Sequence, residues 1–257
     1  MEANDVMKQL EVMYITETVG GGASNEIRSN NVKKELKFMH ITKTGGTSIE
    51  LDAKKKGILW GRYDPNFIKN KYKVVDSGVY GCFMNNMHNS IIHAYNYEEL
   101  INKYDWFTIV RNPYSKLVSL INHYTTHHAV DNFMNLRNPS DVRLHIIDYI
   151  KNHDVEARCS KQSVYVYDEN GHKFINHVLY FENLTEDFNS LMEEYNIDLK
   201  LVTKFTHNTD KSFSVKDLTP DIIRAVNEIY KDDFINFKYY IMDPDNIDFD
   251  NYKFEHY

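Results

Sequence analysis

The sequence predicts an α/β fold in which a mostly parallel central sheet is flanked by helices. Three observations lead to this prediction. Short apolar or β-branched runs alternate along the chain with segments of helical periodicity. Two of these runs, 38–41 and 107–110, each end in a polar turn that leads into a helix. The residues that carry chemistry stand in these turns, at the strand ends where open α/β sheets bind ligands.

The first half of the chain is expected to alternate strands and helices. Strand 38–41 precedes a helix over 47–56, and a short strand is expected at 74–75. A helix over 97–104 precedes strand 107–110. Pro113 suits the first turn of the next helix, and the spacing of Leu117, Leu120 and Ile121 places its apolar face.

In the second half, the spacing of Val142, Ile146 and Ile150 predicts a helix over 142–151. Strands near 164–167 and 178–181 are expected on either side of 168–171, whose sequence Asp-Glu-Asn-Gly is typical of a hairpin turn. Helices over 185–195 and 219–231 complete the fold. Asn183 or Thr185 can cap the first, and Thr219, before Pro220, can cap the second.

Composition divides the chain into a flexible N-terminal extension, residues 1–34, and a single domain, 35–257. The Gly20-Gly21-Gly22 stretch interrupts any regular pattern in the extension. A chain of 257 residues with 42% hydrophobic residues can bury one full core. It has no uninterrupted apolar run of about 18 residues, so no transmembrane segment is expected. Two cysteines, Cys82 and Cys159, indicate free thiols rather than a disulfide framework.

The turn Lys43-Thr44-Gly45-Gly46-Thr47-Ser48 has the composition of a phosphate-binding loop. Glycines let the backbone approach an anion, hydroxyls donate hydrogen bonds, and a helix N-terminus adds about half a positive charge. Lys43 supplies a full charge. The turn does not match the Walker A pattern, which disfavours a metal-dependent NTPase.

The second turn is Arg111-Asn112-Pro113-Tyr114, with Ser119 in the helix that follows. The two turns together resemble those of sulfotransferases that use 3′-phosphoadenosine 5′-phosphosulfate, in particular the membrane-type carbohydrate enzymes of sulfotransferase family 2. Gln162-Ser163, Phe181-Glu182-Asn183-Leu184 and the closing stretch 229–240 are also similar to stretches of that family. The resemblance covers roughly residues 37–240, and it implies a P-loop-NTPase-like sulfotransferase fold.

The resemblance implies a role for each matching residue. Lys43 would meet the 5′-phosphate and the bridging oxygen of the donor as a catalytic residue, and the rest of its turn, Thr44, Gly45, Gly46, Thr47 and Ser48, would hold the 5′-phosphate. Arg111 and Ser119 would bind the 3′-phosphate. Gln162 and Ser163 would lie near the nucleotide or acceptor, and Glu182 would order the site. No metal is required by this chemistry.

The general base is expected to be a histidine, because imidazole accepts a proton near neutral pH. His88 lies where the resembling family places its base, and His93 is the alternative. Glu50 or Asp52 is a further alternative with less support. His123 and His127 have the i, i+4 spacing of zinc ligands, but no glutamate follows His123, and a solvated helix end or an acceptor contact is favoured over a metal site.

Three positions depart from the family pattern. Thr42 stands where proline is usual, Lys116 where arginine is frequent, and Leu179-Tyr180 where an arginine commonly precedes Phe181. These differences bear on the residues expected to contact the acceptor more than on those expected to contact the nucleotide.

The acceptor is expected to be a hydroxylated molecule, most simply a glycan. A net charge of −7 does not favour a polyanion, although basic runs stand at Lys54–Lys56 and at 69–73. A neutral glycan, a glycolipid or a small metabolite is thus as credible as a glycosaminoglycan. No nucleic-acid partner is expected, because no recognised motif accompanies these runs.

Two other functions remain open at this point: a nucleotide or small-molecule kinase of related fold, and a catalytically silent sulfotransferase-like binding protein. The oligomeric state is open as well. The expected location is the cytoplasm, or a soluble compartment of a virus or host cell. Removal of a membrane anchor would instead indicate the Golgi lumen.

Overall fold

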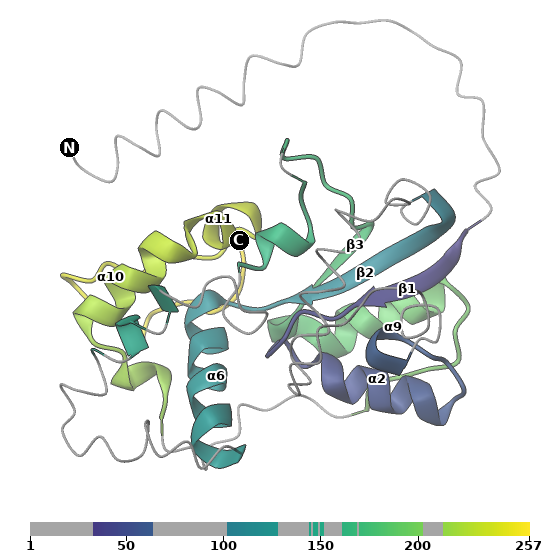
Figure 1. Ribbon diagram of the computed structural model, residues 1–257, viewed down its shortest axis with the longest axis horizontal. Coiled ribbons are helices and arrows are strands. Elements are labelled where there is room, and N and C mark those ends of the chain that lie inside the picture. Colours follow the sequence, from purple (N-terminus) through teal and green to yellow (C-terminus); the bar gives the residue numbers. More distant parts are fainter. Residues whose placement is uncertain are drawn as a thin grey trace, which may run out of the picture. The chain divides into compact units, whose positions relative to one another are not determined.

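The architecture is built on a three-stranded parallel sheet with helices on both faces (Figure 1). The strands are β1 (Glu35–Met39), β2 (Tyr104–Val110) and β3 (His177–Tyr180), in the order β1-β2-β3. Met39 pairs with Thr108, whose hydroxyl also donates a 2.6 Å hydrogen bond to the Met39 carbonyl oxygen. Because all three strands run the same way, their carboxyl ends lie at one edge of the sheet.

The computed structural model describes residues 33–63, 102–127, 144, 146–148, 150–151, 161–168, 170–202 and 213–257, with only the backbone at 62 and 123–127. All of them fall in one compact unit of the chain, Lys33–Tyr257. The helices are α2 (Gly46–Lys55), α6 (Pro113–His127), α9 (Leu184–Glu194), α10 (Pro220–Ile229) and α11 (Lys231–Asn236). Four single-turn 3₁₀ helices are η1 (Gly61–Tyr63), η2 (Ser163–Tyr165), η3 (Phe181–Asn183) and η4 (Val215–Asp217).

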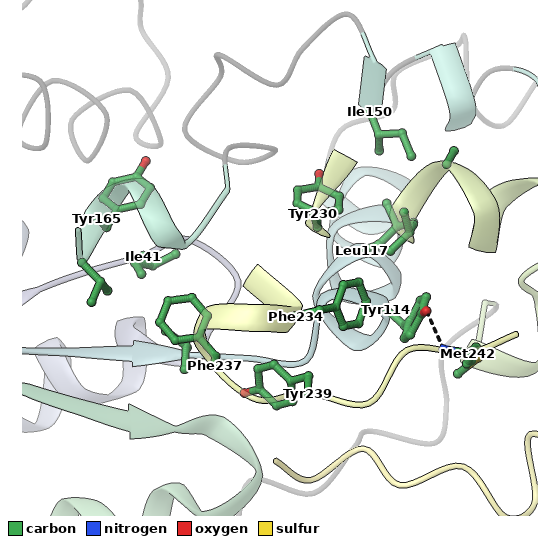
Figure 2. Close-up of a cluster of buried hydrophobic side chains, with 14 of the residues drawn as sticks. Ile41, Tyr114, Leu117, Ile150, Tyr165, Tyr230, Phe234, Phe237, Tyr239 and Met242 are labelled. Atoms are coloured by element: carbon green, nitrogen blue, oxygen red, sulfur yellow. Dashed lines mark hydrogen bonds between the residues drawn. The ribbon is translucent and has the colours of Figure 1, made fainter. Parts of the chain in front are cut away.

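Alternation along β2 sends its side chains into two separate cores. Phe107 and Ile109 face α2 and α9, whereas Trp106 and Val110 face the side that α6, α10 and α11 cover. Figure 2 shows part of this second core, where the Met242 backbone N–H donates a hydrogen bond to the Tyr114 hydroxyl. The sheet is therefore buried on both faces, as parallel sheets usually are.

The core between the sheet and the helices α2 and α9 is aromatic. The ring of Phe107 lies 4.7 Å from that of Phe38 and 5.1 Å from that of Trp60, centroid to centroid. The Trp60 indole N–H donates a 3.0 Å hydrogen bond to the Leu36 carbonyl oxygen. This bond fixes the segment after α2 to the first strand, and with it the direction in which α2 leaves the sheet.

The α/β prediction with a parallel sheet flanked by helices is confirmed. The strand expected at 107–110 begins earlier, at Tyr104, and the one expected at 38–41 is Glu35–Met39. Among residues 142–151, those that the structure describes are helical. The strand expected at 74–75 and most of the helix expected at 97–104 lie outside the described residues. None of the described helices is long and apolar enough to cross a membrane.

The strand expected near 164–167 is wrong, because this segment forms the 3₁₀ turn η2. The carboxylate of Asp233 accepts hydrogen bonds from the backbone N–H groups of Gln162 and Ser163, both at 2.8 Å. Two adjacent N–H groups that point at one carboxylate curl the backbone rather than extend it. The hairpin is reduced to a turn over 168–171 with one antiparallel bridge, between Tyr167 and Lys173.

Two predicted side-chain caps are also wrong. Asn183 and Thr219 occupy the N-cap positions of α9 and α10, but neither side chain makes the capping hydrogen bond. The amide of Asn183 instead donates to Asp187, at 2.6 Å. The helix expected over 219–231 is α10, which ends at Ile229, and the closing stretch 229–240 contains the separate short helix α11, Lys231–Asn236.

Replacing Phe107 with alanine tests the aromatic core. The Phe107 side chain is 0% exposed, so the Phe107→Ala variant leaves a cavity that the surrounding aromatic rings cannot fill. We expect this cavity to lower the free energy of unfolding by about 3–5 kcal/mol. Val202→Ala is the control, because Val202 is 93% exposed and should change stability by less than about 0.5 kcal/mol. Urea unfolding of the two variants measures both. Equal effects would show that Phe107 is not packed as described.

Candidate functional site: an anion-binding edge of the sheet

The turn after β1 is shaped by two residues with left-handed backbone conformation. Lys43 has φ 67° and Gly45 has φ 91°. Glycine takes this conformation without steric cost, whereas for lysine it is uncommon and marks a tight turn. A side chain at Gly45 would also meet the Phe181 ring, 3.1 Å from the position of an added Cβ. The turn therefore needs glycine at this position for both reasons.

The turn feeds directly into α2, whose N-terminus no side chain caps. The N-cap is Gly45, and the Ser48 N–H donates to the Gly45 carbonyl oxygen at 3.2 Å. Backbone N–H groups in the first turn of a helix lack intrahelical partners, and together with the helix dipole they favour an anion. This end of α2 therefore has backbone N–H groups that an anion can bind.

The hydroxyl groups of the turn differ in what they can contact. Thr44 is fully buried, and its hydroxyl donates a 2.7 Å hydrogen bond to the Ile41 carbonyl oxygen. Its side chain therefore shapes the turn, and only its backbone can face an anion. Thr47 is exposed, and Ser48 and Lys43 are half-buried. These three side chains keep the access to solvent that a ligand contact requires.

Arg111 follows β2 and connects the second strand end to the first. Its side chain is 7% exposed, and Nε donates a 2.9 Å hydrogen bond to Ser115 Oγ, one turn along α6. Nη1 donates to the Lys43 carbonyl oxygen at 3.2 Å. A guanidinium has five N–H donors, so three of them have no acceptor among the described residues. An anion can accept hydrogen bonds from the N–H groups that no described residue uses.

The face of the Arg111 guanidinium lies on the ring of Phe181, with 4.0 Å between the guanidinium carbon and the ring centroid. Burial lowers the pKa of Arg111 to about 10, and only in part do Glu182 and Tyr239 oppose this effect. The lowered pKa means that the surrounding protein stabilises the positive charge less well than water does. A negatively charged ligand would supply the missing stabilisation.

Glu182 orders the turn after β2, in the sense the sequence predicted. Its carboxylate accepts hydrogen bonds from the Asn112 backbone N–H and from the Tyr239 hydroxyl, both at 2.9 Å. Burial raises the pKa of Glu182, whereas these hydrogen bonds and Arg111 act in the opposite direction. Its charge lies behind the turn, where it partly balances Arg111.

The side chains of Gln162 and Ser163 form hydrogen bonds with backbone groups and with a buried carboxylate. The Gln162 amide accepts from the Arg111 N–H and donates to the Arg111 carbonyl oxygen, both at 2.8 Å. Ser163 Oγ donates to Asp233 at 2.7 Å and accepts from the Asn236 amide at 3.2 Å. Both side chains are buried and occupied by protein contacts, and Gln162 positions the backbone of Arg111.

Several other candidates lie apart from the Arg111 contacts or outside the described residues. Ser119 is half-buried on α6, one turn beyond Ser115, and it is Ser115 that binds Arg111 Nε. His88 and His93, the two predicted bases, lie outside the described residues, as do Cys82 and Cys159. The backbone of His123 and His127 belongs to α6. The described residues contain no cluster of His, Cys, Asp or Glu that could hold a metal ion.

The alternative bases Glu50 and Asp52 both lie on α2. Glu50 is fully buried, and Asp52 forms a 2.7 Å ion pair with Lys55. Lys56 is likewise paired with Asp198, at 2.8 Å. Two of the three charges in the basic run 54–56 are therefore balanced by carboxylates, which disfavours this run as a binding surface for a polyanion.

Three residues of the site escaped the sequence analysis: Ser115, Phe181 and Asp233. Ser115 is four residues after Arg111 at the start of a helix, so i, i+4 spacing could have identified it. Phe181 precedes the predicted Glu182, but no local pattern indicates that its ring lies on a guanidinium. Asp233 is 71 residues from Gln162, and nothing in the sequence connects the two.

Comparison with known proteins adds no relative, because no family model, curated protein or solved structure matches this chain significantly. The chemical conclusion therefore depends on the geometry and on the sequence pattern. The described residues place an uncapped helix N-terminus, a half-buried lysine and a buried arginine with three available donors at one edge of the sheet. Such an arrangement can bind a phosphate or a similar anion.

Replacing Asp233 with alanine tests the support behind Arg111. The substitution would remove the acceptor of three buried donors, which are the backbone N–H groups of Gln162 and Ser163 and the Ser163 hydroxyl. We expect Asp233→Ala to lower the free energy of unfolding by about 2–4 kcal/mol. The neighbouring Asp232 is 56% exposed and pairs with Lys161, so Asp232→Ala should cost less than about 1 kcal/mol. Chemical denaturation measures both, and equal losses would contradict this role for Asp233.

Glu182 should make stability depend on pH. Its pKa is raised in the folded state, chiefly by burial, so the folded protein holds this proton more tightly than the unfolded chain does. Ionisation of Glu182 therefore weakens folding. The wild type should therefore lose stability, relative to the Glu182→Gln variant, as the pH rises from 4.5, the ordinary pKa of glutamate, through the higher pKa in the folded state. Above that pKa the stability difference between the two proteins should stay constant.

Urea unfolding of the wild type and the Glu182→Gln variant, from about pH 4 to about pH 8, measures this difference. Glu186→Gln, exposed on α9, is the matched control for removing one carboxylate from the same region. A stability difference between the wild type and Glu182→Gln that does not change with pH would contradict the raised pKa.

Proposed function

We propose that this protein binds 3′-phosphoadenosine 5′-phosphosulfate at the edge of the sheet and transfers its sulfuryl group to a hydroxyl of an acceptor. The fold proposed with it is the P-loop-NTPase-like sulfotransferase fold, of which the three parallel strands would be the central part. The proposal is supported by the order of the two turns in the sequence and by their proximity, since Arg111 Nη1 contacts the Lys43 carbonyl oxygen.

One observation carries the proposal: Arg111 is largely buried beside a phosphate-type turn and keeps guanidinium N–H groups that no described residue accepts. A Walker-type site needs only one group of donors, around the phosphates that are transferred. Here a second cationic group stands on the neighbouring strand, held by Ser115 and supported on Phe181. A nucleotide with phosphates on both the 5′ and the 3′ oxygen would use both groups, and an arginine suits a phosphate because its donors can bond in pairs.

The reaction is an in-line displacement at sulfur. The acceptor oxygen forms a new S–O bond while the bond from sulfur to the bridging oxygen breaks, and adenosine 3′,5′-bisphosphate leaves with that electron pair. The acceptor proton passes to a general base, for which His88 and His93 remain the proposed candidates. Lys43 and the first turn of α2 would stabilise the charge that develops on the leaving phosphate. The step needs no metal ion.

The acceptor is proposed to be a hydroxylated molecule of low negative charge, such as a neutral glycan. The net charge of the chain is −7, and Lys55 and Lys56 are already paired with Asp52 and Asp198. A sulfated polysaccharide would need a cationic surface larger than the described residues provide.

Calorimetry with adenosine 3′,5′-bisphosphate tests the proposal without an acceptor. We expect the bisphosphate to bind at least about tenfold more tightly than 5′-AMP or ATP–Mg²⁺, because only the bisphosphate satisfies both cationic groups. Arg111→Ala should abolish this preference. Arg224→Ala is the control, because Arg224 is an exposed arginine paired with Asp245 at 2.8 Å and distant in sequence from both turns.

A preference for the bisphosphate that Arg111→Ala removes and Arg224→Ala retains supports the donor site and justifies assays with labelled donor and neutral glycans. Tighter binding of ATP–Mg²⁺ would indicate a kinase instead. Absence of nucleotide binding would overturn the proposal. Donor binding without turnover on any acceptor would leave the silent binding protein as the better description.

A further inference from the structure

A buried histidine and a buried glutamate lie directly behind the phosphate-type turn. His40 follows β1 and is 6% exposed, and Glu50 of α2 is 0% exposed. His40 Nδ1 lies 3.0 Å from Glu50 Oε1. The imidazole also stacks on Phe38, with the ring centroids 5.6 Å apart and the planes 20° from parallel. The donor chemistry proposed above assigns no role to either residue.

The short distance favours the imidazole tautomer that carries a proton on Nδ1. A lone pair on Nδ1 would repel a carboxylate oxygen 3.0 Å away, whereas an N–H is attracted to it. The two atoms are not aligned as a hydrogen bond, and the buried Nδ1 has no hydrogen-bond partner among the described residues. The contact is therefore electrostatic, and it holds the imidazole in one orientation beside α2.

The opposite edge of the imidazole contacts the first residue of α2. A Cβ added to Gly46 would lie 2.6 Å from His40 Cδ2 and 2.8 Å from Nε2, which is closer than real contacts allow. Glu50 is enclosed in the same way, since a Cβ added to Gly61 would lie 2.0 Å from Glu50 Oε1. The backbone of Gly46 thus rests on the imidazole, and the backbone of Gly61 encloses the carboxylate that orients it.

We propose that His40 and Glu50 are positioning residues for the 5′-phosphate half of the site. Glu50 fixes the imidazole, and the imidazole supports Gly46, so that the N–H groups at the start of α2 point at the anion before it binds. The pair acts through the backbone of Gly46, because the imidazole is buried between Phe38 and this backbone. The inference depends on the proposed nucleotide site and says which half of that site the pair controls.

Three nucleotide probes separate the halves of the site: adenosine 3′,5′-bisphosphate, 5′-AMP and adenosine 3′-monophosphate. His40→Ala and Glu50→Gln should each weaken the binding of 5′-AMP and the bisphosphate about tenfold, the effect of one interaction with a charged group. The affinity for adenosine 3′-monophosphate should fall less, by no more than about threefold, because Ser115 and Gln162 hold Arg111 independently of this pair and only its bond to the Lys43 carbonyl oxygen lies in the affected turn. His40→Asn keeps an N–H near the position of Nδ1 and should recover most of the loss.

Gly46→Ala tests the contact between the imidazole and the backbone directly. In the wild type the added methyl group collides with the imidazole, so 5′-AMP binding should fall at least about tenfold. In the His40→Ala background the space is open, and the same change should cost less than about threefold. Thermal unfolding of every variant, together with its affinity for adenosine 3′-monophosphate, distinguishes a displaced turn from a protein that has not folded.

Each outcome decides between the two proposals. If the wild type binds none of the three nucleotides, the proposed function is overturned, and this inference with it. If the wild type binds them and Glu50→Gln, His40→Ala and Gly46→Ala leave 5′-AMP affinity unchanged, only the inference is overturned. Equal losses for the 5′- and 3′-monophosphates, or additive effects of Gly46→Ala and His40→Ala, would also overturn it, because they would show a general structural role.

Discussion

The burial of the Arg111 charge is the constraint on which the candidate site depends. A guanidinium that is only 7% exposed must find acceptors or a polarisable surface around it, and the surrounding residues supply them incompletely. Ser115 and the Lys43 carbonyl oxygen accept two hydrogen bonds, and the Phe181 ring covers one face. The lowered pKa of Arg111 shows that these contacts do not replace water in full. The same contacts connect the turn after β1 to the turn after β2, so the geometry of either turn depends on this one side chain.

Buried carboxylates set the backbone around Arg111. Asp233 curls the segment that carries Gln162, and Gln162 in turn bonds both backbone groups of Arg111. Glu182 accepts from the N–H of Asn112, the next residue along the chain. Burial raises the pKa of both acids, which means that each is kept at an energetic cost. Acids placed in this way use their charge to fix loops that have no regular hydrogen-bonding partner.

The strands and most helices could be predicted from the sequence because their signals are local. Short apolar or β-branched runs located β1 and β2, and helical spacing and start signals located α6 and α9 within a few residues. The segment at 162–166 could not be predicted, since its apolar and aromatic residues favour a strand and the carboxylate that curls it stands about 70 residues later. The cap at Asn183 failed for a different, local reason, because its side chain bonds Asp187, which competes with the helix backbone.

For the candidate site, the sequence predicted two turns that the structure brings together, but not which of their side chains are occupied by protein contacts. Thr44, Gln162 and Ser163 were expected to contact the nucleotide, and all three side chains are bound to the protein. A sequence pattern records residue types and spacing, whereas availability depends on burial and on partners that arrive from distant segments. These polar side chains beside the site therefore hold its backbone in place and are not available to contact a ligand.

The two adjacent glycines of the turn after β1 are required for different physical reasons. Gly45 has a left-handed backbone conformation, and this requirement comes from the turn itself. Gly46 is constrained from behind, because the His40 imidazole occupies the space that a side chain would need. A turn fixed in this way on its inner side does not need the anion to shape it, so less conformational entropy is lost on binding. Pre-organisation of this kind would let a short loop without a metal ion hold a phosphate, which is the role proposed for the buried His40 and Glu50 next to an apolar core.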